Sequence, residues 1–371
     1  MGVNLVVING QTKLDLTSDT VTADTLQKGK TAHNASGDLI TGELEGASGV
    51  SREDNTSGGE TITVTSDGSS GGDEWESEMT ALIQRGSPTK LPAGLKVIGE
   101  YAFYGCFTFS LSAITSLPSG LVSINKYAFY GLVLTSLTSL PGGLTSIGER
   151  AFMYCTLPLT SLPDGLTSIG AYAFFNCHNF ALTSLPTELT SIGEHGFAHD
   201  DKLTFTSLPS GLTSISKAAF SDCTSLALTS LPDGITSIGD CAFSDCTSLA
   251  LTSLPEGITS IGYQTFYCCS NLALTSLPSG LTSIGSEAFE SCTSLATMTI
   301  PSGVTSVGWN AFCNCTGLTS ITFKGTPTTI ISNAFNGCTN LTDIYVPWSE
   351  GAVANAPWGA TNATIHYDSE V

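Results

Sequence analysis

Hydrophobic residues recur at a fixed spacing along most of the chain. A Leu-Pro pair returns at steps of 22 to 26 residues, from Leu91 to Leu277, and continues as Ile300-Pro301. A phenylalanine recurs in step with it, at Phe103, Phe129, Phe152, Phe174, Phe197, Phe220, Phe243, Phe266, Phe289, Phe312 and Phe335. These eleven units cover residues 91–347. Self-similarity at a period between about 20 and 50 residues is typical of solenoids and other repeat architectures.

The unit over residues 231–253 reads LPDGITSIGDCAFSDCTSLALTS. Its apolar residues are two to five positions apart, which matches neither a helical period nor a long strand alternation. Pro, Gly and Thr-Ser interrupt each unit too often for helices. We therefore expect one coil per unit, with a short strand, a turn at Pro-x-Gly, an extended Thr-Ser-Ile segment and a compact turn through Ala-Phe. Stacked coils would align equivalent residues in ladders about 4.8 Å apart.

A small residue stands four positions before nearly every repeat phenylalanine. It is glycine in eight units and Asn125 or Ser216 in two others, whereas the last unit has Ile331 there, followed by the small residue Ser332. Glycine and asparagine tolerate left-handed backbone angles, so the position predicts a turn with positive φ. The two serines fit better if the position only requires a small side chain. We expect the Thr-Ser pairs to point outward and form hydroxyl ladders.

The unit L-x-x-I-G-x-x-A-F-x-x-C-x-x-L, with proline opening the next strand, resembles the bacterial leucine-rich repeat known as BspA-like. The resemblance covers the eleven units and implies a mainly β repeat solenoid of about eleven 23-residue coils. Such repeats are known from bacterial surface adhesins and from bacteriophage tail proteins. Only the resemblance implies that this chain belongs to one of these two classes.

The N-terminal region differs from the repeats. Residues 1–45 predict a small β-rich module, with strand-like alternation at 4–8 and a turn at Gly10. The string at 19–44 resembles a module found at the heads of phage tail-fibre proteins. That resemblance implies attachment to other phage tail proteins, or oligomerisation as a homo-trimer. Residues 46–72 predict a Gly/Ser/Thr linker with acidic residues.

The two flanks of the repeat array predict caps. Residues 73–90 predict a short capping helix, because Asp73 is a good N-cap and Trp75 and Met79 share one face. A terminal helix would cover the open end of a solenoid. Residues 348–371, with Trp358 and a strand-like run at 363–367, predict a cap at the other end. This last segment resembles the closing segment of the same phage proteins.

Charge and hydropathy narrow the classes of partner. The 371 residues carry 12 Lys+Arg against 32 Asp+Glu, a formal net charge of −20. Few cations argue against nucleic acid or an anionic membrane surface as partner. The longest apolar runs are far shorter than a membrane span, so no membrane insertion is expected. The N-terminus lacks the basic segment and apolar stretch of a secretory signal.

The twelve cysteines follow the repeat. Nine lie three residues after a repeat phenylalanine: Cys106, Cys155, Cys177, Cys223, Cys246, Cys269, Cys292, Cys315 and Cys338. Leu132 and Asp200 take this position in the other two units. A position shared by Cys and Leu predicts a small apolar core residue, and stacked parallel side chains are the wrong geometry for disulfides. We expect free thiols, which suit synthesis in a reducing cytoplasm.

The sequence offers no metal, cofactor or catalytic site. There is no Cys-x-x-Cys pair, and the most metal-like cluster is Glu194, His195, His199, Asp200 and Asp201. Because the repeat predicts a turn there, we interpret these as solvated surface residues. His33, His178 and His366 have no evident partner. No Ser-His-Asp arrangement, Walker loop or GxGxxG is present, so we expect no enzyme activity.

The positions around Ala-Phe vary freely from unit to unit. They carry the aromatic residues Tyr101, Tyr104, Tyr127, Tyr130, Tyr154, Tyr172, Phe175, Tyr263, Tyr267 and Trp309. Aromatic rings gathered on one edge are candidates for receptor binding, by stacking on sugars or anchoring a protein. The alternative is that they only shield the edge of the core.

These observations predict a non-enzymatic receptor-binding protein. With the phage resemblance, it would belong to a tail fibre or tail tip, recognise a bacterial surface glycan or protein, and reside in the virion after assembly in the host cytoplasm. The first alternative is a BspA-like adhesin on a bacterial cell surface. The second is a tail-associated polysaccharide depolymerase, which would need a pair of carboxylates in a groove.

Overall fold

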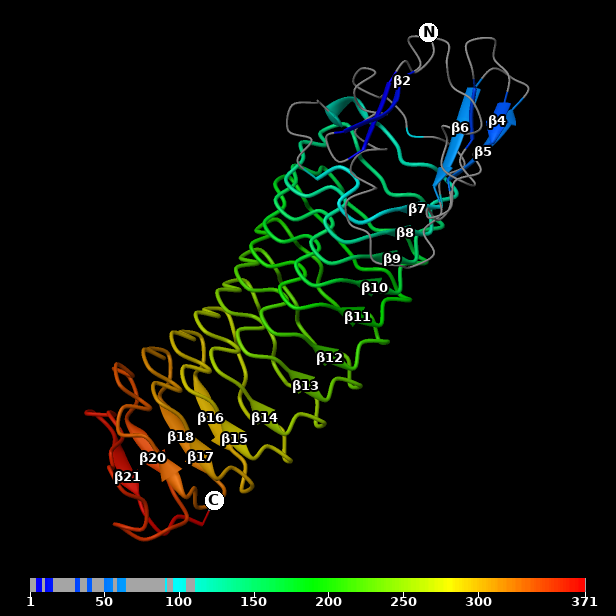
Figure 1. The fold of residues 1–371 in the computed structure, drawn as a ribbon. Coiled ribbons are helices and arrows are strands. Elements are labelled where there is room, and N and C mark those ends of the chain that lie inside the picture. Colours follow the sequence, from blue (N-terminus) through cyan, green and yellow to red (C-terminus); the bar gives the residue numbers. More distant parts are fainter. Residues whose placement is uncertain are drawn as a thin grey trace. The chain divides into compact units, whose positions relative to one another are not determined.

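A computed structural model describes residue 91, residues 96–104 and 111–370, and the backbone of six strands between Leu5 and Val64. The chain divides into two compact units, Met1–Pro158 and Leu159–Val371. The repeats in both units form parallel β-solenoid coils, and one coil corresponds to one sequence repeat, as predicted (Figure 1). Three of the eleven repeat phenylalanines belong to the first unit and eight to the second.

In the first unit, each coil contributes a strand of two residues to a parallel sheet. The strands are β7 (Val97–Ile98), β8 (Ser123–Ile124) and β9 (Ser146–Ile147). Their register pairs Ile98 with Ile124 and Ile124 with Ile147. The one helical turn described here is the 3₁₀ segment η2, Leu111–Ala113.

The second unit repeats the same short strand and adds a longer sheet near its C-terminal end (Figure 1). The short strands are β10 (Ser168–Ile169), β11 (Ser191–Ile192), β12 (Ser214–Ile215), β13 (Ser237–Ile238), β14 (Ser260–Ile261), β15 (Ser283–Ile284), β17 (Ser306–Val307) and β19 (Thr329–Ile330). The longer sheet contains β16 (Thr297–Ile300), β18 (Ser320–Phe323), β20 (Asp343–Tyr345) and β21 (Thr364–His366). All neighbouring pairs are parallel, because every coil runs in the same direction.

The Thr-Ser-Ile segment is a strand because its side chains alternate between core and surface. The isoleucine, replaced by Val307 in one coil, is buried; where the unit has Thr-Ser, the serine is half-buried or exposed and the threonine is exposed. We predicted ladders of hydroxyl groups that bond one another, but the threonine hydroxyls have other partners. Instead, Thr236 Oγ1 donates to the carbonyl of Thr213 at 3.3 Å, and Thr282 Oγ1 donates to that of Thr259 at 2.8 Å. Each hydroxyl thus bonds the backbone of the preceding coil.

The core is a column of parallel phenylalanine rings, as predicted. Each repeat phenylalanine is 0% exposed. Successive ring centroids are 5.0 and 5.1 Å apart in the first unit, and 5.1 to 5.8 Å apart in the second. This spacing follows the separation of neighbouring strands, so side-chain stacking and backbone pairing reinforce one another.

The repeat glycine does not have the positive φ that we predicted from its residue type. Its role is close approach. A Cβ on Gly239 would lie 2.5 Å from the backbone nitrogen of Lys217 in the preceding coil, and one on Gly308 would lie 2.5 Å from that of Ser286. Ser216 occupies the same position and uses its hydroxyl to donate to the carbonyl of Ile192 at 2.6 Å. The prediction of a small residue is therefore confirmed for the coils of Ser216, Gly239 and Gly308, whereas the last coil has Ile331 at this position.

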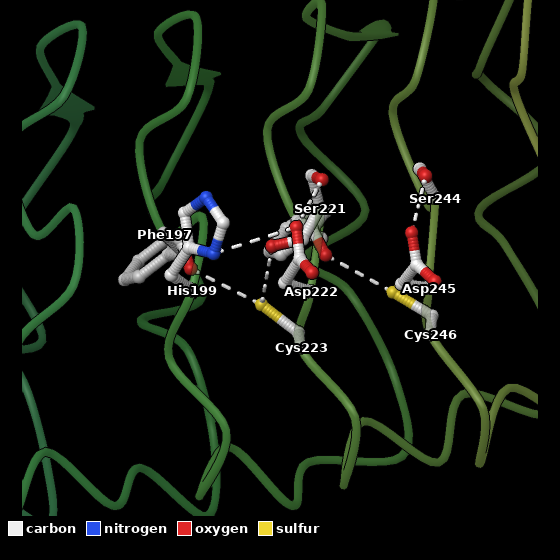
Figure 2. Close-up of polar contacts among 9 residues, drawn as sticks. Phe197, His199, Ser221, Asp222, Cys223, Ser244, Asp245 and Cys246 are labelled. Atoms are coloured by element: carbon white, nitrogen blue, oxygen red, sulfur yellow. Dashed lines mark hydrogen bonds and ion pairs between the residues drawn. The ribbon is translucent and has the colours of Figure 1, made fainter.

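The repeat cysteines form a column of hydrogen-bonded thiols (Figure 2). Cys223 Sγ donates to the Phe197 carbonyl at 3.1 Å, and Cys246 Sγ donates to that of Phe220 at 3.0 Å. The same bond recurs at Cys155, Cys269, Cys292, Cys315 and Cys338, at 2.9 to 3.0 Å. All eleven cysteines within the described residues are free, and burial raises the pKa of Cys155 to about 12. Cys106 lies outside those residues.

Three antiparallel hairpins precede the repeats. They pair β1 (Leu5–Ile8) with β2 (Gln11–Asp15), β3 (Thr31–His33) with β4 (Leu39–Thr41), and β5 (Val50–Asn55) with β6 (Gly59–Val64). The third hairpin lies within residues 46–72, where composition predicted a linker. Strands β5 and β6 were not part of that prediction, although the Thr-Ile-Thr-Val alternation at 61–64 favours a strand. The capping helix predicted at 73–90 lies outside the described residues.

The last residues of the second unit form a partial further coil. Trp358 is fully buried and its carbonyl accepts the Phe335 N–H at 2.9 Å, as the alanine carbonyl of the next coil does elsewhere. Strand β21 corresponds to the strand-like run at 363–367 and pairs with β20. Among the described residues, no helix is long and apolar enough to cross a membrane.

Candidate functional site

The turn through each repeat phenylalanine has an unusual backbone. In most coils the residues two before and two after it have positive φ, for example Tyr101 (56°), Tyr154 (61°) and Asp222 (60°). Left-handed φ is uncommon for residues other than glycine. The stacking geometry explains it, because alternate N–H groups of the turn donate to the next coil. Phe103 N–H, for instance, donates to the Ala128 carbonyl at 2.9 Å, whereas Tyr104 N–H donates within its own coil to Tyr101.

This backbone separates inward from outward side chains. The residue before each phenylalanine, which is alanine in most coils, is buried, and so are the described cysteines three positions after it. The residues three and two before the phenylalanine, and one and two after it, are mostly half-buried or exposed. We call these four positions of every coil the turn edge. All ten aromatic residues singled out in the sequence lie on it.

In the first unit, five of these aromatic residues form one cluster, which we call the tyrosine cluster: Tyr101, Tyr104, Tyr127, Tyr130 and Tyr154. Tyr101 and Tyr127 stack face to face with centroids 4.9 Å apart. Tyr104 contacts Tyr130 at 5.3 Å, and Tyr130 contacts Tyr154 edge to face at 5.7 Å. Such contacts hold the rings in defined orientations without burying them.

Two cations and one carboxylate belong to the same surface. Lys126 Nζ lies 5.6 Å from the centroid of the Tyr127 ring, and the Arg150 guanidinium carbon lies 5.4 Å from it. Glu149 pairs with both, and its contact with Lys126 Nζ is 2.8 Å. The hydrogen bond between them lowers the pKa of Glu149 and raises that of Lys126. The turn edge therefore carries a fixed charge network beside the rings.

In the second unit, the first coils combine aromatic rings with histidines. Tyr172 stacks on His195 at 4.5 Å, and Phe175 meets His199 edge to face at 4.9 Å. His199 Nδ1 is 3.4 Å from an oxygen of Asp222 (Figure 2). Partial burial lowers the pKa of His195, which keeps its imidazole neutral over a wider pH range.

The remaining aromatic residues of the second unit are dispersed. Tyr263 is 45% exposed and Trp309 is 49% exposed. Tyr267 is half-buried, and interaction with Cys268 raises its pKa to about 12. No ring contact joins these three in the described part of the unit. Polar contacts take over there: Gln264 Nε2 donates to Glu287 at 2.6 Å, and Asn333 Nδ2 donates to Asn310 at 2.7 Å.

The residues of the metal-like cluster do not converge on one point. Within the described residues no group of three His, Cys, Asp or Glu side chains is placed to hold an ion. Asp200, which we interpreted as solvated, is 1% exposed and takes the place of a ladder cysteine. One of its oxygens accepts the Cys177 N–H at 2.7 Å, and burial raises its pKa well above the usual range. The repeat places Asp200 at the position of a ladder cysteine, but the sequence did not indicate that the aspartate side chain points inward.

His366 also differs from the prediction, which gave it no partner. Its Nε2 is 2.7 Å from Asp343 Oδ1, and its ring stacks on Tyr345 at 4.6 Å. Both contacts join β21 to the adjacent β20. The pair is half-exposed and connects neighbouring strands.

Sequence reasoning missed the charged and histidine members of the turn edge. Lys126, Glu149, Arg150 and His195 stand three or two positions before a repeat phenylalanine, the same positions that carry Tyr101 and Tyr127. Repeat position was therefore the signal that could have identified them, because equivalent positions in adjacent coils stack.

The comparisons with known proteins agree with the repeat geometry. The BspA type leucine rich repeat region (6 copies) matches residues 96–227 and 224–342. The chain belongs to the BspA-type leucine-rich repeat family. No curated protein matches the chain.

Several solved structures are similar to this BspA-type chain. A leucine-rich repeat protein from Bacteroides ovatus is 22% identical, with 87% of this chain and 99% of that chain covered and a TM-score of 0.45. A leucine-rich cell surface protein from Faecalibacterium prausnitzii is 23% identical, with coverage of 88% and 94% and a TM-score of 0.46. A leucine-rich repeat protein from T. pallidum is 32% identical over 50% of this chain and 75% of that chain, with a TM-score of 0.31.

Proposed function

We propose that this BspA-type protein is a non-enzymatic binding protein that recognises a glycan or protein on a bacterial surface through its turn edge. The observation that carries the proposal is the tyrosine cluster. Its five rings are oriented by one another and by the left-handed turns, so little conformational freedom is lost when a ligand contacts them. Tyrosine supplies large contact area and a hydroxyl at low entropic cost.

Two settings fit this proposal. The likeness of residues 19–44 to tail-fibre modules supports a bacteriophage tail, with the N-terminal module attaching to tail proteins or forming a trimer. The repeat array itself supports an adhesin on a bacterial cell surface. In either setting, several copies would multiply weak contacts. Antibody detection in purified virions and in cell-envelope fractions distinguishes the two settings.

The proposal is tested by capture of whole bacterial cells and a glycan array by the full chain. We expect Tyr104→Ala together with Tyr154→Ala to reduce retention at least tenfold, because these rings are the exposed members of the cluster, at 40% and 41%. Val122→Ala is the matched control, since Val122 is 43% exposed in the same unit but lies off the turn edge. Equal retention by the double variant and the wild type would contradict the proposal.

A depolymerase would behave differently in the same assay. It would release new reducing ends from a polysaccharide that the protein retains. We expect retention without such release, because no described cluster combines a carboxylate pair with an enclosed groove.

A further inference from the structure

Three aromatic side chains of the second unit flank a coil whose turn edge carries no aromatic residue. Tyr263 and Tyr267 lie on the turn edge of one coil, and Trp309 lies on that of the coil two further along. The coil between them has Ser286 at the position equivalent to Tyr263 and Trp309. Because serine is small, no bulky side chain of the same column separates these two exposed rings.

The spacing of the coils suits a small cation between the rings. The phenylalanine centroid of the middle coil is 5.5 Å from that of the preceding coil and 5.1 Å from that of the following one. A cation is attracted to the face of an aromatic ring when it lies within about 6 Å of the ring centroid. A cation above Ser286 would lie one coil step from Tyr263 and one from Trp309.

The middle coil carries two half-buried carboxylates on its turn edge. Glu287 accepts a hydrogen bond from Gln264 Nε2 at 2.6 Å, and its backbone N–H donates to the Trp309 carbonyl at 2.8 Å. Glu290 stands one position after the repeat phenylalanine, and partial desolvation and the charge of Glu287 raise its pKa. The two carboxylates therefore repel one another, and a cation bound beside them would relieve this repulsion.

No basic side chain compensates these carboxylates. None of the ion pairs among the described residues includes Glu287 or Glu290. Partial desolvation and the charge of Glu287 also raise the pKa of Tyr263, so this carboxylate lies close to one of the rings. Residues 159–370 contain three lysines and no arginine against sixteen Asp+Glu. Such an excess of negative charge attracts cations.

We propose that Tyr263, Tyr267 and Trp309, with Glu287 and Glu290, form a binding site for a methylated ammonium group. Aromatic faces and nearby carboxylates stabilise a cation that donates no hydrogen bonds. A primary ammonium would lose hydrogen bonds to water that the ring faces do not replace. The site lies outside the tyrosine cluster, so this proposal goes beyond the function proposed above and does not depend on it.

The test titrates the full chain with tetramethylammonium chloride at constant ionic strength, and ligand-observed NMR measures binding. tert-Butanol is the neutral probe of similar size, and methylammonium chloride is the cation that can donate hydrogen bonds. We expect saturable binding of tetramethylammonium. Binding of tert-butanol should be at least about tenfold weaker, because it lacks the charge, and binding of methylammonium severalfold weaker.

Variants locate the site. Tyr263→Ala with Trp309→Ala should weaken tetramethylammonium binding at least about tenfold, and Glu287→Gln with Glu290→Gln should weaken it severalfold. Asp233→Asn is the matched control for charge, because Asp233 is an exposed carboxylate of the same unit that lies off the turn edge. This control should leave the affinity within about twofold. Circular dichroism of each variant controls for folding.

Each part of the proposal has an outcome that contradicts it. Equal affinity for tert-butanol would overturn the cationic ligand class, and equal or tighter binding of methylammonium would overturn the methylated group. Unchanged binding by the double alanine variant would overturn the location, and so would an equal loss in Asp233→Asn and the double glutamine variant. If tetramethylammonium does not bind saturably, the site is absent. Capture of cells through the tyrosine cluster would then still stand, because the two sites share no residue.

Discussion

The interior columns and the turn edge are built from the same coils but obey different constraints. Inside, each side chain stacks on its equivalent in the next coil, as Phe220 does on Phe243 at 5.7 Å. At the turn edge, the backbone alone fixes the coil, and the side chains range from tyrosine to arginine and glutamate. The difference shows that packing restricts residue type only where the side chain is enclosed, so the edge is free to change its chemistry without changing the fold.

The largest effect should come from the phenylalanine column. Phe243→Ala removes a fully buried ring with stacked neighbours on both sides, which should lower the free energy of unfolding by about 3–5 kcal/mol. Urea unfolding followed by circular dichroism measures it. If Phe243→Ala lowers the free energy of unfolding no more than an exposed turn-edge variant does, the interior column and the turn edge do not differ in their contribution to stability.

Close approach between coils should give the next largest effect. A Cβ at Gly239 would lie 2.5 Å from the Lys217 nitrogen, whereas nothing lies within 4 Å of one at Gly142. We expect Gly239→Ala to cost about 1–3 kcal/mol and Gly142→Ala to be near neutral. Thermal unfolding of the pair compares them, and equal melting temperatures would argue against the close-approach role.

Asp200 tests the thiol column through pH. Burial raises its pKa in the folded protein well above the ordinary aspartate value, so the folded protein keeps the carboxyl protonated to a higher pH than the unfolded chain does. Its contribution to stability is therefore full below about pH 4, the ordinary aspartate pKa, and is lost as the pH rises through the raised value.

Asp200→Cys restores the residue type of the column. It should flatten this pH dependence and raise the free energy of unfolding at pH 7 by about 1–3 kcal/mol. Asp200→Asn keeps the acceptor for Cys177 and should flatten the profile too, while exposed Asp201→Asn should not. Unfolding curves between pH 4 and pH 8 provide the measurement. An unchanged profile in Asp200→Cys would show that the carboxyl is not the titrating group.

The smallest effect belongs to the turn edge. Tyr263→Ala removes a ring that is 45% exposed, and we expect a change in unfolding free energy within about 0.5 kcal/mol. The same urea titration used for Phe243→Ala applies. A cost of several kcal/mol would mean that the edge ring supports the core after all.

The repeat made the fold and the interior predictable, because Phe, Ile and Cys recur at positions that stack. The role of the glycine could not be read in the same way, since glycine satisfies both a positive φ and a close approach. The left-handed positions were hidden because they carry Tyr, Arg, His, Asp and Cys, residue types with no common signal. The ion pair of Glu149 with Lys126 and the inward orientation of Asp200 depend on neighbours one coil away, which only the register reveals.

The sequence separation between hydrogen-bonded residues determines which changes in repeat number the fold tolerates. Threonine hydroxyls reach 23 residues back and thiols reach 26, so every coil depends only on its immediate neighbours. After in-frame duplication or loss of a whole repeat, each remaining coil still contacts neighbouring coils of the same structure. A single-codon insertion instead shifts two interfaces at once. Recombination between repeats can thus lengthen the array without changing the contacts within each coil.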